Sequence, residues 1–164
     1  MILSLQTFTT EHKASLIHNL NSFNVTRYLS SRIPSPYTEN DAIWWIEHGS
    51  KNGIIRAVEV DGKFAGCVGA EPGQFEYAYA AEVGYWLAEP FWGKGYASKA
   101  LALLIDEVQN TSEIVRLHAS VFEGNQASCK VLENCGFILE GRFKKAVYKQ
   151  GEFYNTHLYA KIIR

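Results

Sequence analysis

The stretch Pro90-Phe91-Trp92-Gly93-Lys94-Gly95-Tyr96-Ala97 decides the fold, because it joins a strand pattern to a long helix pattern. Before it, residues 82–87 alternate with the period of a strand, with Val83, Tyr85 and Leu87 on one face. After it, from about Gly95 to Asn110, apolar residues recur at helical spacing at Leu101, Leu104, Ile105 and Val108. Glycines let a backbone approach a ligand closely, and free N–H groups at a helix start attract anions. The stretch therefore predicts an anion cradle between strand and helix.

Two common phosphate motifs do not fit this stretch. A P-loop needs GxxxxGK followed by Ser or Thr, and no glycine stands at the required distance before a Gly-Lys pair. The dinucleotide motif GxGxxG needs a third glycine three residues after Gly95, where Ser98 stands. A tight glycine turn without a ligand is the structural alternative at this point.

The rest of the chain alternates strand and helix patterns. Asp61-Gly62 between two apolar runs is typical of a type I′ hairpin turn, and Gly136 is placed to end a helix. Strands are predicted over 2–8, 54–60, 63–69, 75–79 and 114–121, and two more follow Phe137 on either side of a turn at 149–152. Helices are predicted over 10–20, 25–29, 38–50 and 125–135. In the helix over 38–50, Ile43 and Ile46 are expected to face inward. We therefore expect one α/β (α+β) domain over 1–164, with a mixed, mostly antiparallel central sheet of about six to seven strands flanked by helices on both faces.

Composition is that of an ordinary globular protein and excludes several partners. The chain has 164 residues, 47% hydrophobic and 20% charged, with a formal net charge of -1 and no long basic run. This balance argues against binding to nucleic acid or to an anionic membrane surface. No apolar stretch approaches the roughly 18 residues of a membrane span, and the first residues lack the basic start of a signal peptide. We therefore expect a cytoplasmic protein.

Cysteine and histidine spacing gives no disulfide or metal signal. Cys67, Cys129 and Cys135 are an odd number without a CxxC pair, which favours reduced thiols. A nucleophilic cysteine is the alternative, but Cys135 falls on the inward face of its helix, where a free cysteine usually packs. The five histidines form no HxxxH pair, so we expect no metal site.

A second constellation, Asn125-Gln126-Ala127-Ser128, opens the last helix pattern. Asn is a favoured N-cap, so capping alone explains Asn125. The position of this stretch in the chain is informative, however. It follows the strand predicted over 114–121, which itself follows the helix that begins at the cradle.

With these motifs in this order, the sequence resembles the GNAT superfamily of N-acetyltransferases, and within it the Rim-type ribosomal-protein N-terminal acetyltransferases. The matching stretches are Ala81 to Leu87, Pro90 to Leu101, Asn125 to Ser128 and Leu132 to Ile138. The resemblance extends over essentially the whole chain in element order. It implies transfer of an acetyl group from acetyl-CoA to a primary amine by direct attack in a ternary complex.

The resemblance also implies where acetyl-CoA binds. The pyrophosphate falls on the cradle, mainly on backbone N–H groups of Gly93, Lys94, Gly95, Tyr96, Ala97 and Ser98. The pantetheine arm pairs like an extra strand with the backbone of Trp86 and Leu87, and Asn125 bonds to it. Trp92 stands where the family pattern begins with Gln or Arg, so one side-chain contact of the family is absent.

Glu82 and Ser128 are the catalytic residues that we expect. An amine must be neutral to attack a thioester, and a lysine amine of pKa about 10.4 is mostly charged near pH 7. A carboxylate removes such a proton directly or through one water, and the family match assigns this role to Glu82. A surface carboxylate at a strand end is the alternative. The resemblance implies a tyrosine on the helix after Asn125 that serves the leaving thiolate in many members of the family, but this helix contains none. Ser128 is therefore our choice to hydrogen-bond or protonate the thiolate, and a polar residue at a helix start is the alternative. Backbone N–H groups near Leu87 are expected to form an oxyanion hole.

The acceptor site is expected in the N-terminal third, where a cation and aromatic residues gather: Arg27, Tyr28, Tyr37, Trp44 and Trp45. Packing of Trp44 or Trp45 between helix and sheet is the alternative. The expected partners are acetyl-CoA and an amine, such as the N-terminus of a ribosomal or other protein, and the chain is a monomer or homodimer. Two rivals remain open: a polyamine, amino-sugar or antibiotic acetyltransferase, and a non-catalytic acyl-CoA-binding sensor.

Overall fold

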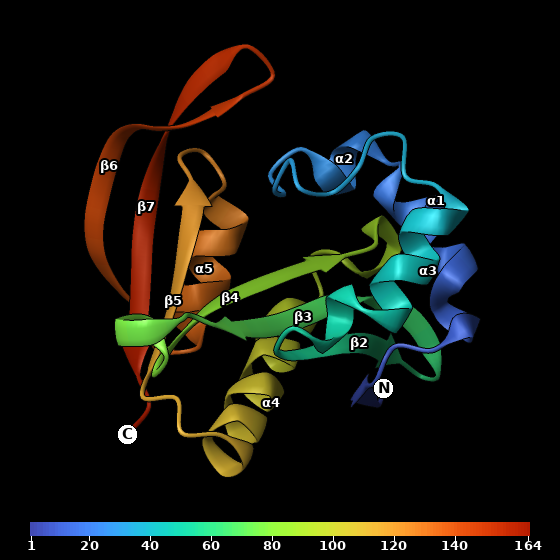
Figure 1. The fold of residues 1–164 in the computed structure, drawn as a ribbon, viewed down its shortest axis with the longest axis horizontal. Helices are drawn as coiled ribbons and strands as arrows, with labels where there is room; N and C mark the ends of the chain where they lie inside the picture. The colour runs from blue at the N-terminus through green and yellow to red at the C-terminus, as the bar shows by residue number, and fades with distance from the viewer.

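The computed structural model describes all 164 residues as one mixed sheet with helices packed against it (Figure 1). The seven strands lie in the order β1-β2-β3-β4-β5-β7-β6, and only β4 and β5 are parallel neighbours. The strands are β1 (Leu3–Gln6), β2 (Ile54–Val60), β3 (Lys63–Pro72), β4 (Ala80–Leu87), β5 (Arg116–Phe122), β6 (Ile138–Lys149) and β7 (Glu152–Ile162). The α-helices are α1 (Lys13–Leu20), α2 (Phe23–Thr26), α3 (Glu39–Glu47), α4 (Tyr96–Thr111) and α5 (Gln126–Asn134). The expected fold class is confirmed.

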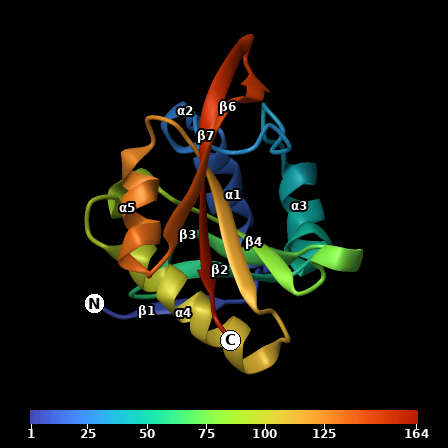
Figure 2. The same ribbon diagram turned by 90° about the vertical axis from the view of Figure 1, so that its left-hand side faces the viewer.

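The sheet separates two hydrophobic cores, because its strands send alternate side chains to opposite faces. Figure 2 shows α5 on one side of the sheet and α3 on the other. The larger core joins α4 and α5 to the sheet and contains the fully buried Leu101, Leu104 and Leu132. The smaller core contains Leu16 of α1 and Ile46 of α3. Helices therefore cover both faces, as the sequence predicted.

Local chemistry explains where several elements begin and end. Asp61 and Gly62 take positive φ angles of 50° and 74° in the β2–β3 turn, as a type I′ turn requires. Thr38 caps α3, because its hydroxyl oxygen accepts the Asp41 N–H at 3.3 Å. Gly136 follows α5 with a φ of 82°, the left-handed conformation that commonly ends a helix. These three boundaries are confirmed.

Two detailed expectations are wrong. The strand predicted over 75–79 is absent: Phe75–Tyr77 form a 3-10 turn between β3 and β4. Phe75 has a positive φ of 54° and is 85% exposed, so the chain turns away from the sheet at this point. In α3 the buried face runs through Ala42 and Ile46, whereas Ile43 is exposed.

The point where β4 and β5 part positions the candidate site. These parallel strands pair only at Ala80 with Arg116, Ala81 with Leu117 and Glu82 with His118. Beyond Glu82, β4 continues beside β3 alone, and β5 continues beside β7. The two strands are seen to spread apart in Figure 1. We call the region between them the β4–β5 fork.

Candidate functional site

The cradle between β4 and α4 is built from main-chain groups. Gly93 and Gly95 have positive φ angles of 71° and 76°, and a Cβ at either position would meet no atom within 4 Å. The left-handed backbone favours glycine at both positions, and the space beside them is open. Because α4 begins at Tyr96, the N–H groups of its first turn have no acceptor within the helix. Together with the helix dipole, these donors suit an anionic group.

The cradle side chains are engaged elsewhere. Tyr96 is buried in the larger core beside Phe91, and its hydroxyl donates to the Met1 sulfur. The Lys94 ammonium donates to the Pro90 carbonyl at 2.7 Å. Tyr96 therefore has only its backbone N–H to offer a ligand at this turn.

The indole of Trp92 fastens the cradle to the end of β4. Its Nε1–H donates to the carbonyl oxygen of Leu87 at 2.7 Å. Trp92 stands where the family pattern has Gln or Arg, and its side chain bonds to the protein's own backbone. This hydrogen bond gives Trp92 a structural role that the sequence did not indicate.

Backbone groups of β4 alternate between β3 and the fork. The Ala88 N–H donates to the Ala65 carbonyl on the β3 side, whereas the Tyr79 carbonyl accepts from Arg116 on the β5 side. Even-numbered residues therefore turn their N–H and C=O groups toward β3, and odd-numbered residues turn theirs toward the fork.

This alternation corrects one expected backbone contact. The Trp86 carbonyl faces β3, where a Cβ on Gly66 would come within 2.1 Å of its oxygen. Its backbone is therefore part of the β3–β4 pairing and does not face the fork. Tyr85 and Leu87 are the residues that present backbone groups to the fork.

A serine and a tyrosine meet on the α4 and α5 side of the sheet. The Ser128 hydroxyl lies 2.7 Å from the Tyr85 hydroxyl, which also donates to the Ser128 carbonyl at 3.0 Å. Burial raises the pKa of Tyr85, so its phenol keeps its proton at neutral pH. Asn125 caps α5, because its side-chain oxygen accepts the Ser128 N–H at 3.3 Å. The sequence indicated the cap and Ser128, but no local signal connected Tyr85 with a residue 43 positions later.

Glu82 lies exposed at the base of the fork, in register with His118 of β5. The β3–β4 register runs without a bulge, so Glu82 faces away from Val83 and the larger core. Burial lowers the pKa of His118, and the Glu82 carboxylate opposes that shift. The base of the fork therefore holds a carboxylate beside an imidazole that is neutral near pH 7. Both lie on the opposite face of the sheet from Tyr85 and Ser128.

Arg27 and Tyr28 come next to the far end of β5. The Arg27 guanidinium lies over the Tyr28 ring, 4.7 Å from its centroid, and the Tyr28 ring lies 6.3 Å from that of Phe122. Phe122 ends β5 and shares its face with His118, four residues earlier. This cation and its two rings lie on the same face as Glu82.

The other aromatic residues expected at the acceptor site do not join this group. Tyr37 is buried in the smaller core, where burial raises its pKa to about 12. Trp45 packs against the same core, with its ring 5.8 Å from Phe8 and its indole N–H buried without a partner. Trp44 is 56% exposed on the outer side of α3. The expectation of one aromatic wall is therefore wrong for Tyr37 and Trp45, because both pack in the smaller core, Tyr37 just before α3 and Trp45 within it.

A groove of about 410 Å³ runs beside the first turns of α4. Its lining includes Ser98 of the cradle, two lysines, Lys99 and Lys161, and Asn134 of α5. The Asn134 amide donates to the Ser98 hydroxyl at 3.5 Å, which joins α5 to the start of α4. The groove thus begins at Ser98 of the cradle and carries charges of both signs, because Asp106 lines it together with the two lysines.

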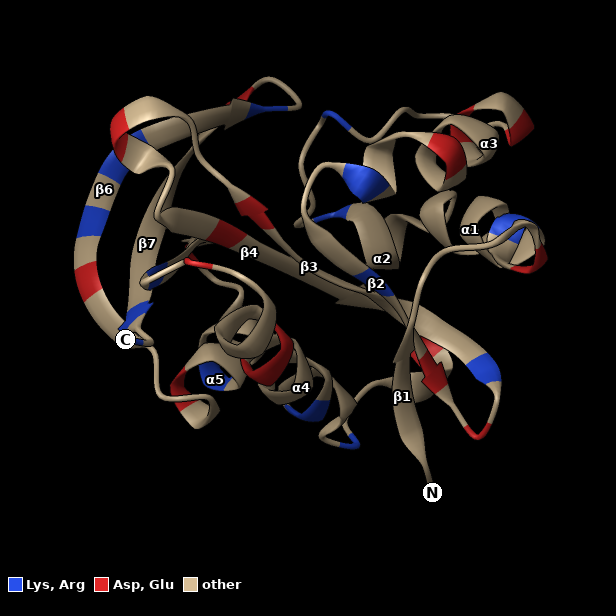
Figure 3. Ribbon diagram, turned by 60° about the horizontal axis from the view of Figure 1, so that its bottom comes forward, with Lys and Arg blue, Asp and Glu red and all other residues tan.

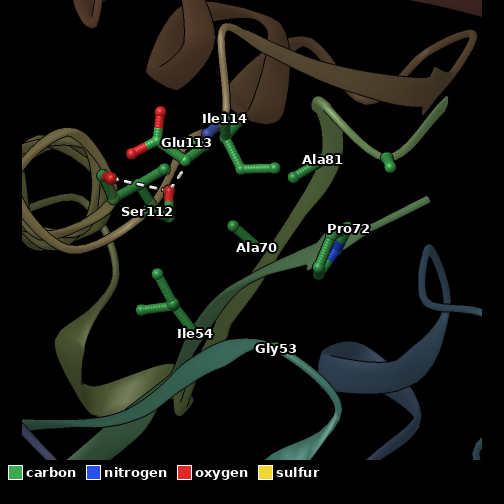
Figure 4. A pocket seen from close by; sticks show the side chains of 10 residues that line it. Gly53, Ile54, Ala70, Pro72, Ala81, Ser112, Glu113 and Ile114 are labelled. Carbon is green, nitrogen blue, oxygen red and sulfur yellow. Dashed lines mark hydrogen bonds between the residues drawn. The ribbon is translucent and has the colours of Figure 1, made fainter. Parts of the chain in front are cut away.

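A second cavity, of about 210 Å³, lies at the opposite end of α4. Figure 4 shows its mostly apolar lining, with Ile54, Ala70, Ala81 and Ile114 facing inward and Glu113 at the edge. None of the candidate site residues lines it. It is therefore separate from the candidate site.

Charge and ligand clusters indicate no other site. Figure 3 shows acidic and basic residues interspersed over the elements. No group of three or more His, Cys, Asp or Glu side chains is placed to hold a metal ion. No helix is long and apolar enough to cross a membrane.

Comparison with known proteins places this geometry in a family. The acetyltransferase (GNAT) domain family matches residues 3–138. A ribosomal-protein-serine acetyltransferase of Escherichia coli (strain K12) is 39% identical over 83 residues, which cover 51% of this chain and 46% of that protein. The L-amino acid N-acetyltransferase AaaT of the same strain is 25% identical over 133 residues, covering 80% of each chain.

A solved structure agrees over nearly the full length. The Microcin C7 self immunity acetyltransferase MccE, in complex with acetyl-CoA and AMP, has a TM-score of 0.84 at 24% identity, covering 98% of this chain and 92% of that chain. Several curated relatives are matched over only about half their length, such as 46% of the first. Because the family match includes most of the chain, from β1 to the start of β6, this protein belongs to the GNAT acetyltransferase family.

Proposed function

We propose that this chain is an acetyl-CoA-dependent N-acetyltransferase that transfers the acetyl group to a primary amine by direct attack in a ternary complex. The observation that carries the proposal is the division of groups across the fork. An anion cradle and a hydroxyl pair lie on one face, and a carboxylate lies on the other. The attacking amine needs a base beside it, and the leaving thiolate needs a proton donor beside it.

Main-chain groups bind acetyl-CoA in this proposal. The N–H groups from Gly93 to Ser98 receive the pyrophosphate, for which the open space beside both glycines leaves room. The pantetheine arm pairs with the backbone that faces the fork, at Tyr85 and Leu87, and Asn125 lies beside it. The adenosine end extends along the groove that Lys99 and Lys161 line. A 3′-phosphate would be attracted by these two cations.

The reacting groups follow from the same placement. Glu82 takes the proton of the attacking amine, directly or through water. The Leu87 N–H stabilises the oxyanion that forms on the thioester carbonyl. The Ser128 hydroxyl, hydrogen-bonded to the protonated Tyr85, donates to the leaving thiolate. Tyr85 thereby supplies the phenol that α5 itself lacks.

The acceptor is a protein N-terminus or a small-molecule amine. The relatives support both classes, since one is named for a ribosomal-protein serine and another for L-amino acids. The three cysteines are free, which fits the expected reducing cytoplasm. Monomer and homodimer remain the expected states.

Thiol release tests the proposal. The protein is mixed with acetyl-CoA and, in separate reactions, peptides, L-amino acids, spermidine or an amino sugar, and free CoA and acetylated product are followed together. Release of CoA in equal amount to the acetylated amine is the expected result. Binding of acetyl-CoA without release across the panel would contradict it and favour the acyl-CoA sensor.

A further inference from the structure

Arg27 is a cation without a protein partner. Its guanidinium makes no ion pair and no hydrogen bond, although it is stacked over the Tyr28 ring at 4.7 Å. Two other arginines are paired with carboxylates, Arg56 with Glu107 and Arg116 with Glu140. A guanidinium that lies over an aromatic ring still has the N–H donors around its own edge free for an oxygen ligand.

The segment that bears Arg27 is held in place from a distant part of the chain. The Lys149 ammonium, at the end of β6, donates to the carbonyls of Thr26, Arg27 and Leu29 at 3.2, 3.1 and 2.6 Å. Lys149 also lies 5.6 Å from the centroid of the Phe122 ring. These contacts occupy the Lys149 charge and fix the backbone of 26–29 against the β6–β7 hairpin. The backbone that carries the exposed Arg27 side chain is therefore held in place, and the Tyr28 ring gives its guanidinium a surface to lie on.

Carboxylates of neighbouring elements accept hydrogen bonds from neutral side chains and not from Arg27. Glu89 accepts from the Ser22 hydroxyl at 2.9 Å and from the Asn24 amide at 3.3 Å. Glu123, which follows β5, accepts from the Asn155 amide at 2.7 Å. Glu152, opposite Lys149 in the hairpin, accepts from the Tyr154 hydroxyl at 3.3 Å. Arg27 therefore makes no direct ion pair with a carboxylate of the chain.

The face of the sheet that holds Glu82 therefore has a negative charge at one end and a positive charge at the other. Glu82 supplies a carboxylate at one end, beside His118. At the other end Arg27 lies over the Tyr28 ring, which is next to Phe122, four residues further along β5. Four residues of strand span roughly 13 Å. A cationic amine is drawn to one end and an anionic group to the other.

We propose that the acceptor carries a carboxylate as well as its amine, and that Arg27 binds this carboxylate. The inference rests on the proposed acetyl transfer and narrows its acceptor class. It disfavours polyamines and amino sugars, whose charges are all positive. The separation along β5 suits a carboxylate that is several bonds away from the amine, as in a peptide with an acidic side chain near its N-terminus.

Matched peptides test the charge preference. C-terminally amidated tetrapeptides carry Glu, Gln or Lys at the second, third or fourth position, so that the side chain holds the only charge besides the amine. We expect kcat/KM for the best Glu peptide to exceed that of its Gln partner about fivefold, the upper range for an exposed ion pair. The Lys peptide is expected to be worst, and added salt is expected to reduce the ratio. Free L-glutamate and its amide distinguish an amino acid from a peptide source.

Two arginine variants distinguish a specific contact with Arg27 from a general effect of positive charge. Arg27→Gln is expected to bring the Glu to Gln ratio close to one, mainly through the KM of the Glu peptide. Arg32→Gln is the control, because Arg32 is an exposed arginine five residues later whose guanidinium faces Glu71 at 4.0 Å; it is expected to keep the ratio. Lys149→Met is expected to lower the ratio by loosening residues 26–29.

The outcomes distinguish this inference from the proposed function. Equal use of Glu and Gln peptides by the unaltered protein overturns the carboxylate assignment, as does a preference that survives in Arg27→Gln. Thiol release with spermidine or an amino sugar in preference to all carboxylate acceptors also overturns it, but leaves acetyl transfer standing. Absence of thiol release with every amine removes both.

Discussion

The two faces of the β4–β5 fork are built in different ways. On the α4 and α5 face, the cradle offers backbone N–H groups from consecutive residues between Gly93 and Ser98, which we call the cofactor half. On the opposite face, the groups are side chains from distant segments, Glu82, Arg27 and Phe122, with Lys149 as their tether, which we call the acceptor half.

Because one half uses main-chain groups and the other uses side chains, the two halves respond differently to amino-acid substitution. A main-chain cradle depends on backbone conformation, so it tolerates an unusual residue such as Trp92 where the family has Gln or Arg. A site made of side chains changes with each substitution in any of its segments. We infer that the cofactor half serves the shared part of the reaction, and that the acceptor half sets what is specific to this chain.

The largest expected effect is in the acceptor half. Glu82→Gln is expected to lower kcat by about 10²- to 10⁴-fold while acetyl-CoA still binds, because a general base is lost. The deficit is expected to be greatest at low pH, where more of the acceptor amine is protonated. Glu71→Gln is the matched control, since Glu71 lies opposite Glu82 on β3. Loss of folding, or an equal loss in Glu71→Gln, would show that Glu82 is not the base.

A glycine pair tests the cofactor half. Gly95→Val is expected to weaken CoA binding more than about tenfold, because a side chain disturbs the N–H groups and the left-handed backbone. Gly62→Val carries the same conformational strain at φ 74°, in the β2–β3 turn far from the cradle. Isothermal titration with CoA measures both. An unchanged CoA affinity in Gly95→Val would remove the phosphate role from this turn.

Trp92 provides a milder test of the same half. Trp92→Phe keeps a ring but removes the hydrogen bond to Leu87, so we expect a loss of about 1 kcal/mol in stability and a few-fold loss in CoA affinity. Trp44→Phe is the control, because Trp44 makes no side-chain hydrogen bond and is exposed. If both variants behave alike in thermal unfolding and CoA titration, Trp92 does not hold the cradle.

The smallest expected effect is electrostatic. Burial lowers the pKa of His118, and the Glu82 carboxylate raises it, with opposing smaller effects from Arg116 and Glu140. In Glu82→Gln the His118 pKa is therefore expected to fall further in an NMR titration. Since the folded value lies below the unfolded one, the stability from neutral His118 is complete above pH 6.5 and is lost as pH falls through the folded value. A rise of the His118 pKa in Glu82→Gln would contradict the assigned proximity.

The sequence predicted what depends on neighbouring residues. The cradle, the Asp61-Gly62 turn and the Thr38, Asn125 and Gly136 helix boundaries follow from backbone preferences of single residues, which act locally. The strand wrongly predicted over 75–79 shows the limit of such patterns. Its alternating aromatic residues imitate a strand, but the sheet position beside β3 is already taken by β4.

The sequence could not predict what depends on distant pairing. Tyr85 meets Ser128 only because α5 packs against β4, and Lys149 reaches residues 26–29 across more than 100 positions of chain. Tyr37 was expected at an open wall, since nothing local distinguishes an aromatic residue of a pocket from one of a core. The acceptor half was therefore the part least accessible to sequence reasoning.

Amide hydrogen exchange with and without CoA tests most directly whether the cofactor half binds through its main chain. CoA is expected to slow exchange at the amides of residues 93–98 and of Leu87, and to leave residues 26–29 nearly unchanged. Unaltered exchange at 93–98 under saturating CoA, with protection elsewhere, would contradict the account.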